Sequence, residues 1–255
     1  YSSEMASALC SIDRVSASAN MTNRLSEAIV EAYKETNGAP ITFTKMLEEY
    51  QSKMADPSKD DTISSVLKQL VRANIFEEED KADLIGDCYI IKMDGYPKDG
   101  PIAKAIVYFL ISKLNNIYEQ LEKQATNDEV VQIRHFSIID EAHYMLDFDN
   151  RPLRNLIAVG RNKGLSIILA TQNMSSFKSK GFDFYANAQY PLIMKQQTID
   201  DKVIKDLFGV SGNELQEIRT AIAGLQKGEL IIKDQMAFAL GMGKKYKKIN
   251  VTHLI

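Results

Sequence analysis

Cysteine is scarce in this sequence, and the marks of a membrane or secreted protein are missing. The two cysteines, Cys10 and Cys88, lie far apart and match no metal-binding spacing. They are typical of the reduced, small apolar residues of an intracellular protein. No apolar run approaches the roughly 20 residues that span a bilayer, and no signal peptide is visible. We therefore expect a cytoplasmic protein without a membrane partner.

A strong net charge is also missing. The formal net charge is −3, with 45% of the residues hydrophobic and 25% charged. This is ordinary globular composition, enough for one large domain or for a core with an accessory piece. Any contact with nucleic acid would use a local patch or an assembly rather than the overall charge. Because the chain begins at Tyr1 rather than Met, we expect it to be a piece of a longer protein.

Residues 1–80 are predicted to form a helical subdomain or insertion. Residues 25–33 place apolar side chains at helical spacing. Thr42 or Thr44 could cap a second helix, and one of the two aspartates at 60–61 could cap a third. The remainder, residues 81–255, is predicted to be a separate domain.

In that second part, short apolar runs alternate with amphipathic stretches. The predicted elements, in chain order, are strand 88–93, helix 102–121, strand 130–139, helix 152–162, strand 165–170, strand 190–194, helices 200–208 and 213–223, and strand 229–232 with 236–240 as a candidate hairpin partner. This order predicts an α/β fold with a mainly parallel sheet flanked by helices. Right-handed crossovers then bring the carboxyl ends of the strands to one edge, where ligands bind in such sheets.

Two adjacent carboxylates, Asp140 and Glu141, follow a short and mostly apolar run. At the end of a buried strand, Asp140 can hold Mg²⁺ through a bound water, because magnesium prefers carboxylates and retained waters. Glu141 can orient and polarise the water that attacks a terminal phosphate. The alternative is a chance Asp-Glu pair at a strand edge. The apolar run before the pair, and Ala142-His143 after it, favour the active site of an ATPase.

A second polar pair, Thr171-Gln172, ends the next predicted strand, about 30 residues further along the chain. In a parallel sheet this pair lies beside Asp140 and Glu141 on the same edge. Gln172 could then hydrogen-bond the terminal phosphate or the attacking water and report its presence. We assign Thr171 and Gln172 to nucleotide binding.

The histidines next to the acidic pair do not suggest a zinc site. His135 and His143 flank the predicted strand, and neither a cysteine nor a third ligand stands at metal spacing. We expect His143 to pack or to hydrogen-bond behind Glu141.

Basic residues occur in two places where two interpretations compete. Arg161 lies in Gly-Arg-Asn-Lys-Gly, which fits either a capped helix end or an arginine offered to the nucleotide of a neighbouring subunit. Arg151 and Arg154 compete for that second role. The lysines of residues 244–248 could contact phosphates or form a solvated tail.

The phosphate-binding loop of most ATPases is missing. That loop reads Gly-x-x-x-x-Gly-Lys-Ser/Thr, and its backbone N–H groups and lysine hold the phosphates. The nearest approach, Gly243-Lys244, is followed by Lys245, and Phe238 stands in the place of the first glycine. We expect the loop to lie upstream of Tyr1 in the intact protein, and this fragment alone to be inactive.

Residues 138–143 (Ile-Ile-Asp-Glu-Ala-His) and residues 160–172 (Gly-Arg-Asn-Lys-Gly-Leu-Ser-Ile-Ile-Leu-Ala-Thr-Gln) resemble the second half of the HerA/FtsK-type P-loop ATPase core. The resemblance covers about residues 85–240. It implies a RecA-like fold in which Asp140 and Glu141 form the Walker B motif, Gln172 ends the sensor strand, and Arg161 acts across a subunit interface. The helical lead-in and the loop 94–100 resemble the HerA-like component of restriction systems that depend on DNA phosphorothioation.

The resemblance implies ATP and Mg²⁺ as cofactors and ATP hydrolysis coupled to movement along DNA, most simply double-stranded DNA. It also implies a homo-oligomer such as a hexameric ring, with other restriction subunits as partners. Two alternatives stay open. The chain could be a catalytically incomplete, ATPase-like scaffold or oligomerisation module. It could also be a fragment of a helicase with an Asp-Glu-Ala-His motif, although Leu169 replaces the serine that such helicases carry in the later strand.

Overall fold

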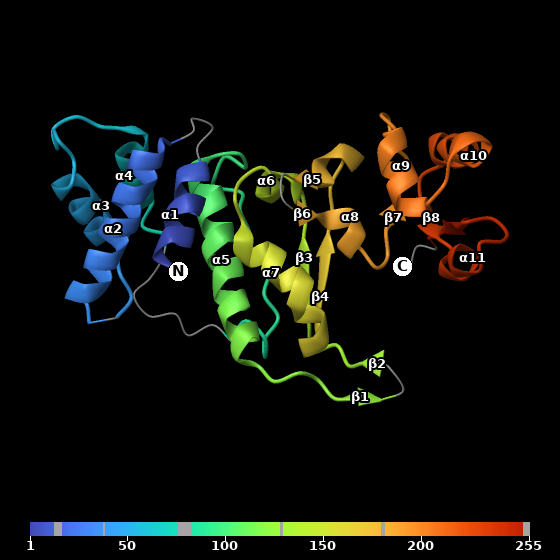
Figure 1. Ribbon diagram of the computed structural model, residues 1–255, viewed down its shortest axis with the longest axis horizontal. Coiled ribbons are helices and arrows are strands. Elements are labelled where there is room, and N and C mark those ends of the chain that lie inside the picture. The colour runs from blue at the N-terminus through green and yellow to red at the C-terminus, as the bar shows by residue number, and fades with distance from the viewer. Residues whose placement is uncertain (13–16, 38, 76–82, 128–129, 180–181, 252–255) are drawn as a thin grey trace. The chain divides into compact units, whose positions relative to one another are not determined.

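The computed structural model describes residues 1–12, 17–37, 39–75, 83–127, 130–179 and 182–251 (Figure 1). The chain divides into two compact units. The first combines Tyr1–Ser137 with Tyr144–Ile168, and the second combines Ile138–His143 with Leu169–Ile255. The predicted boundary near residue 80 lies outside the described residues.

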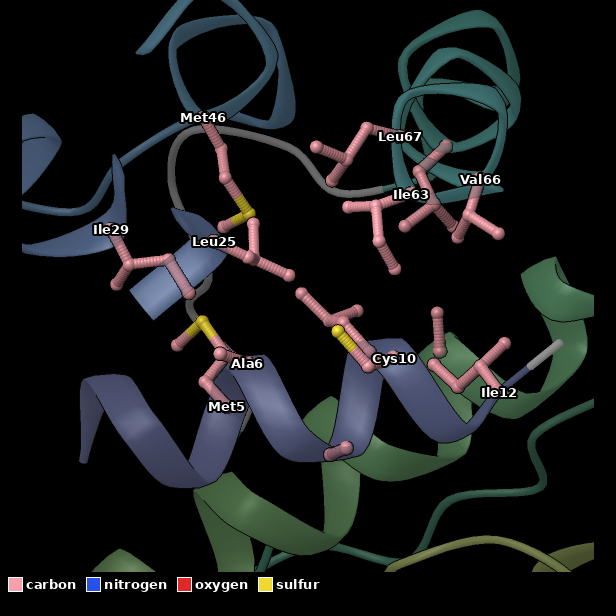
Figure 2. Close-up of a cluster of buried hydrophobic side chains, with 14 of the residues drawn as sticks. Met5, Ala6, Cys10, Ile12, Leu25, Ile29, Met46, Ile63, Val66 and Leu67 are labelled. Atoms are coloured by element: carbon pink, nitrogen blue, oxygen red, sulfur yellow. The ribbon is translucent and has the colours of Figure 1, made fainter. Parts of the chain in front are cut away.

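Four helices begin the first unit: α1 (Ser2–Ser11), α2 (Ala19–Glu35), α3 (Phe43–Ser52) and α4 (Thr62–Ala73). Their apolar faces share one core, and Figure 2 shows side chains of all four converging, among them Leu25 and Met46. This convergence of helical stripes is what the apolar periodicity of the sequence predicts. Thr42, rather than Thr44, caps α3 by accepting the Lys45 N–H.

Asp61 joins three of these helices. As the N-cap of α4, it accepts the Ser64 N–H through Oδ1 at 2.9 Å. Its Oδ2 accepts the Tyr50 hydroxyl of α3 at 2.6 Å and the Arg24 guanidinium of α2 at 3.3 Å. A single carboxylate therefore satisfies a helix terminus and also ties two neighbouring helices to it.

Helix α5 (Pro101–Gln120) packs against α7 (Arg151–Val159). The Asn155 amide donates to Asn115 Oδ1 at 2.7 Å and to Glu119 Oε1 at 3.0 Å. Four short elements lie in the chain segments around these helices: β1 (Thr126–Asn127), β2 (Val130–Val131), α6 (His143–Leu146) and the 3₁₀ helix η1 (Gly160–Lys163).

Strands β3 (His135–Ile139) and β4 (Leu165–Leu169) pair with each other and run in the same direction (Figure 1). Along β3, every second side chain is exposed, including Phe136 at 57% and Ile138 at 69%. On β4, Ile168 is 43% exposed. One face of this parallel pair therefore presents apolar side chains to solvent.

The second unit is built on an antiparallel sheet in the order β7 (Leu192–Ile193), β8 (Glu229–Lys233) and β9 (Tyr246–Asn250). Helices α9 (Asp201–Phe208) and α10 (Gly212–Ala223) share an apolar core with Ile193 and Ile231 of that sheet. The smaller elements are η2 (Met174–Phe177), β5 (Lys178–Ser179), β6 (Phe182–Asp183), α8 (Phe184–Asn187) and α11 (Gln235–Leu240).

The mixed α/β class is confirmed, whereas the predicted mainly parallel sheet is not found. Among the described residues, parallel pairing is confined to β3 and β4, and the three-stranded sheet is antiparallel. The prediction of a strand at 88–93 is wrong, because this stretch is irregular and Ile90 is 89% exposed. Its backbone has no neighbouring strand within the described part of the chain to pair with.

The predicted hairpin strand at 236–240 is also wrong, since this stretch lies in helix α11. Asp234 Oδ1 accepts the N–H groups of Met236 and Ala237, both at 3.1 Å, and so caps the helix start. The partner of β8 is instead β9, which contains part of the basic run that was expected either to contact phosphates or to form a solvated tail.

Candidate active site

The acidic pair and the polar pair lie at the carboxyl ends of two adjacent parallel strands. Asp140 follows β3, and Thr171 comes two residues after the end of β4. The Ala170 N–H donates to Ile139 O at 2.9 Å, and the Ala142 N–H donates to Ala170 O at 2.8 Å. These two backbone bonds hold the strand ends together, and both belong to the second unit.

Glu141 is the centre of this arrangement. Gln172 Nε2 donates to Glu141 Oε1 at 2.6 Å, which brings together two residues that are 31 positions apart in sequence. On the other side, His143 Nδ1 lies 3.3 Å from Glu141 Oε2, a distance that makes an ion pair only when the imidazole is protonated and that lies outside hydrogen-bond geometry. The Glu141 side chain is 24% exposed. Both of its carboxylate oxygens therefore have a neighbour, and the group remains reachable by water.

Glu141 adopts an unusual backbone conformation. Its φ is +51°, in the left-handed region that glycine favours and that is uncommon for a long side chain. Backbone strain of this kind gathers at functional sites. Sequence reasoning missed this feature, because nothing in Asp-Glu-Ala-His indicates a left-handed residue.

Asp140 is exposed, and its Oδ1 accepts the N–H of Glu141 at 2.9 Å. One carboxylate at a strand end fits the water-mediated contact expected with Mg²⁺, since this ion keeps several waters and takes its other ligands from substrate phosphates. Among the described residues, no group of three or more His, Cys, Asp or Glu side chains could hold a metal ion directly. A metal ion at Asp140 would therefore need ligands other than these side chains.

Thr171 lies beside Gln172 and is half-buried. Its Oγ1 accepts the Asn173 N–H at 3.5 Å, a long bond that leaves the hydroxyl close to the turn after β4. Thr171 has the expected position at the strand end, although its contact is with the backbone of its own turn.

Arg161 is exposed on η1 in the first unit, and the sequence around it forms a capped helix end as one interpretation expected. Gly164 ends η1 with φ of +81°, and a Cβ there would lie 2.7 Å from Gln132 O. Lys163 Nζ donates to the Tyr118 and Glu119 carbonyls at the end of α5. Of the two competing arginines, Arg154 is ion-paired with Asp149, whereas Arg151 is exposed.

The lysines near the C-terminus are paired with carboxylates in the second unit. The pairs are Lys244 with Glu217 at 2.6 Å, Lys245 with Glu214 at 3.5 Å, Lys247 with Asp234 at 2.8 Å and Lys248 with Glu229 at 2.6 Å. Within the described residues, this basic run is therefore neutralised locally and does not form a bare cationic patch.

A comparison with models of known protein families finds no match to this chain, and a comparison with curated proteins finds none either. In the described part of the chain, every helix is too short or too polar to cross a membrane.

Proposed function

We propose that this chain is the C-terminal portion of an ATP-driven DNA translocase of the HerA/FtsK type, acting in a restriction or other DNA-processing system. The observation that carries the proposal is the contact between Gln172 Nε2 and Glu141 Oε1 at the carboxyl ends of two parallel strands. This edge is where α/β sheets bind ligands, and a carboxylate beside an amide suits the activation of water next to a phosphate.

Each polar residue has one task in the proposed reaction. Glu141 accepts a proton from the attacking water and orients it, and its 24% exposure permits that access. Gln172 detects the terminal phosphate by donating its amide hydrogen bond to a phosphate oxygen instead of to Glu141. Asp140 would hold Mg²⁺ through a water, and that ion supplies neutralisation of the phosphate charge when it is bound.

A complete ATPase site needs groups that these residues do not supply. The phosphate-binding loop has to come from outside this chain, because no Gly-x-x-x-x-Gly-Lys-Ser/Thr sequence occurs in it. In the proposed ring, which could be a hexamer, Arg161 faces the nucleotide of a neighbouring subunit, and its exposure on η1 is compatible with that role. Double-stranded DNA and further restriction subunits are the proposed partners.

Replacement of Glu141 tests the proposal. In the longer protein that joins this chain to a phosphate-binding loop, we expect Glu141→Gln to lower kcat for ATP hydrolysis by about 10²- to 10⁴-fold, because the amide cannot accept the proton. ATP binding and the unfolding midpoint should be unchanged. Glu214→Gln, at an exposed glutamate of α10, is the control and should hydrolyse ATP normally. Full turnover by Glu141→Gln would remove Glu141 from catalysis.

The missing loop also favours a second function, an ATPase-like scaffold that binds partners without hydrolysing ATP. Direct nucleotide binding separates the two functions. A fluorescent ATP analogue should bind the longer protein with Mg²⁺ at micromolar concentration if it is a motor, and should not bind it if it is a scaffold. No binding by any protein containing this chain would favour the scaffold.

A further inference from the structure

We propose that His143 is a positioning residue for Glu141, one that holds the carboxylate in the orientation needed to activate water. This inference rests on the proposed ATPase function and adds a residue to it. It starts from the 3.3 Å separation between His143 Nδ1 and Glu141 Oε2. Both atoms are shielded from solvent, and they lie outside hydrogen-bond geometry with each other. The contact is therefore a close electrostatic one, for which water competes weakly.

The backbone fixes the separation between the two side chains. Ala142, which lies between them, is fully buried, and its N–H donates to Ala170 O at 2.8 Å. Helix α6 begins at His143, immediately after this anchored residue. The left-handed turn at Glu141 changes the chain direction just before the anchor. The backbone bond to Ala170 therefore fixes the relative position of Glu141 and His143, in addition to their own side-chain torsions.

The two neighbours of Glu141, Gln172 and His143, differ in how freely they can move. Gln172 is exposed and holds Oε1, so its amide is able to turn towards another acceptor. His143 is held next to Oε2 by the anchored backbone. When Gln172 leaves Oε1, that oxygen becomes able to accept a proton, while His143 continues to orient the carboxylate. A glutamate side chain without such a neighbour samples several rotamers, and misplacement by about 1 Å can cost about 10²-fold in rate.

The test compares three variants of the longer, loop-containing protein. We expect His143→Ala to lower kcat by about 10- to 100-fold with KM for ATP changed less than about twofold, because binding does not use this residue. His143→Asn places an amide donor near the position of Nδ1 and should restore most of kcat. His135→Asn, at the far end of β3, is the control and should retain wild-type turnover.

The outcomes separate this inference from the function on which it depends. If Glu141→Gln abolishes turnover while His143→Ala keeps wild-type kcat, the positioning role is overturned and the ATPase stands. If Glu141→Gln turns over normally, the proposed ATPase fails, and the positioning role fails with it. If His143→Ala and His143→Asn are equally slow, a polar N–H group beside Oε2 is not what turnover needs, and this also overturns the proposal.

A measurement on the 255-residue chain itself does not depend on turnover. The imidazole ¹⁵N resonance of His143 should shift on Glu141→Gln, since its neighbour loses a negative charge. It should stay in place on Glu214→Gln. An unshifted resonance in both variants would show that the two side chains are not in contact in solution, and would overturn the proposal.

Discussion

Glu141 combines a long charged side chain with a left-handed backbone, a combination that a residue selected for stability would avoid. Its φ of +51° costs on the order of 1 kcal/mol for any residue with a Cβ. The surrounding hydrogen bonds of Ala142 and Ala170 hold it there. A residue with a Cβ at this position therefore lowers the stability of the fold, and the chain nevertheless carries a carboxylate there.

The left-handed backbone of Glu141 predicts an unusual response to glycine at this position. We expect Glu141→Gly to be more stable than Glu141→Ala by about 1 kcal/mol, because glycine adopts positive φ without strain. At Glu217, inside helix α10, the order should reverse, with glycine less stable than alanine by about 1 kcal/mol. Urea unfolding of the four variants measures both differences. Equal stability of the two Glu141 variants would contradict the left-handed conformation.

Some of the site follows from the sequence, and some does not. The adjacency of Glu141 and Gln172 follows from two apolar strands that run parallel, because their carboxyl ends must meet. The place of His143 behind Glu141 was expected only in outline, since the distance between the two side chains depends on the turn between them. The left-handed backbone of Glu141 precedes Ala142, whose N–H donates to Ala170 O, and local residue patterns do not contain such a tertiary contact.

At the scale of single elements, periodic stretches were the easiest to predict. The helix expected at 102–121 is α5 (Pro101–Gln120), and the strand expected at 165–170 is β4 (Leu165–Leu169). The two wrong strands have physical causes. Residues 88–93 have an apolar pattern but find no pairing partner among the described strands. In 236–240, the Asp234 cap outweighs the strand-like composition.

The pairing of β8 with β9 should be sensitive to acid. Lys247 holds the pKa of Asp234 below its usual range, and Lys248 does the same for Glu229. A carboxyl whose pKa is lowered by folding adds stability above its unfolded pKa of about 4, and this stability is lost as the pH falls through the folded value. We therefore expect the urea midpoint of the second unit to drop below about pH 4.

The double variant Lys247→Gln/Lys248→Gln is the matched control for this acid effect. It should be less stable than wild type at pH 7 and should lose less on acidification, because the lysines no longer lower the pKa values of Asp234 and Glu229, although backbone hydrogen bonds still do. Titration of the urea midpoint between pH 7 and pH 3 compares the two proteins. An identical acid loss in both would show that these lysines do not set the pKa values.

At the scale of the whole molecule, exposed apolar side chains occur in both units, and two in the first unit lie on its paired strands. Phe136 and Ile168 belong to parallel strands, and such strands are normally covered on both faces. We expect wild-type protein to enhance the fluorescence of the hydrophobic dye anilinonaphthalene sulfonate, and Phe136→Lys/Ile168→Lys to reduce it. Each lysine should change the free energy of unfolding by less than about 0.5 kcal/mol.

Leu153→Lys provides the contrast for these surface changes. Leu153 is fully buried in α7, so a lysine there should destabilise the protein by several kcal/mol. If Phe136→Lys is as destabilising as Leu153→Lys, the face of β3 is covered in solution and the dye prediction fails.

The paired lysines at the end of the chain affect how this protein would respond to a polyanion. Proteins that grip phosphates with free lysines release condensed counterions, and their affinity falls steeply as salt is added. Here Lys244, Lys245, Lys247 and Lys248 would each first have to leave a carboxylate. The carboxylate would then gather a cation of its own, which offsets the one released from the phosphate. Binding through β9 would consequently show a shallow dependence on ionic strength, whereas a steep one would point to cations elsewhere.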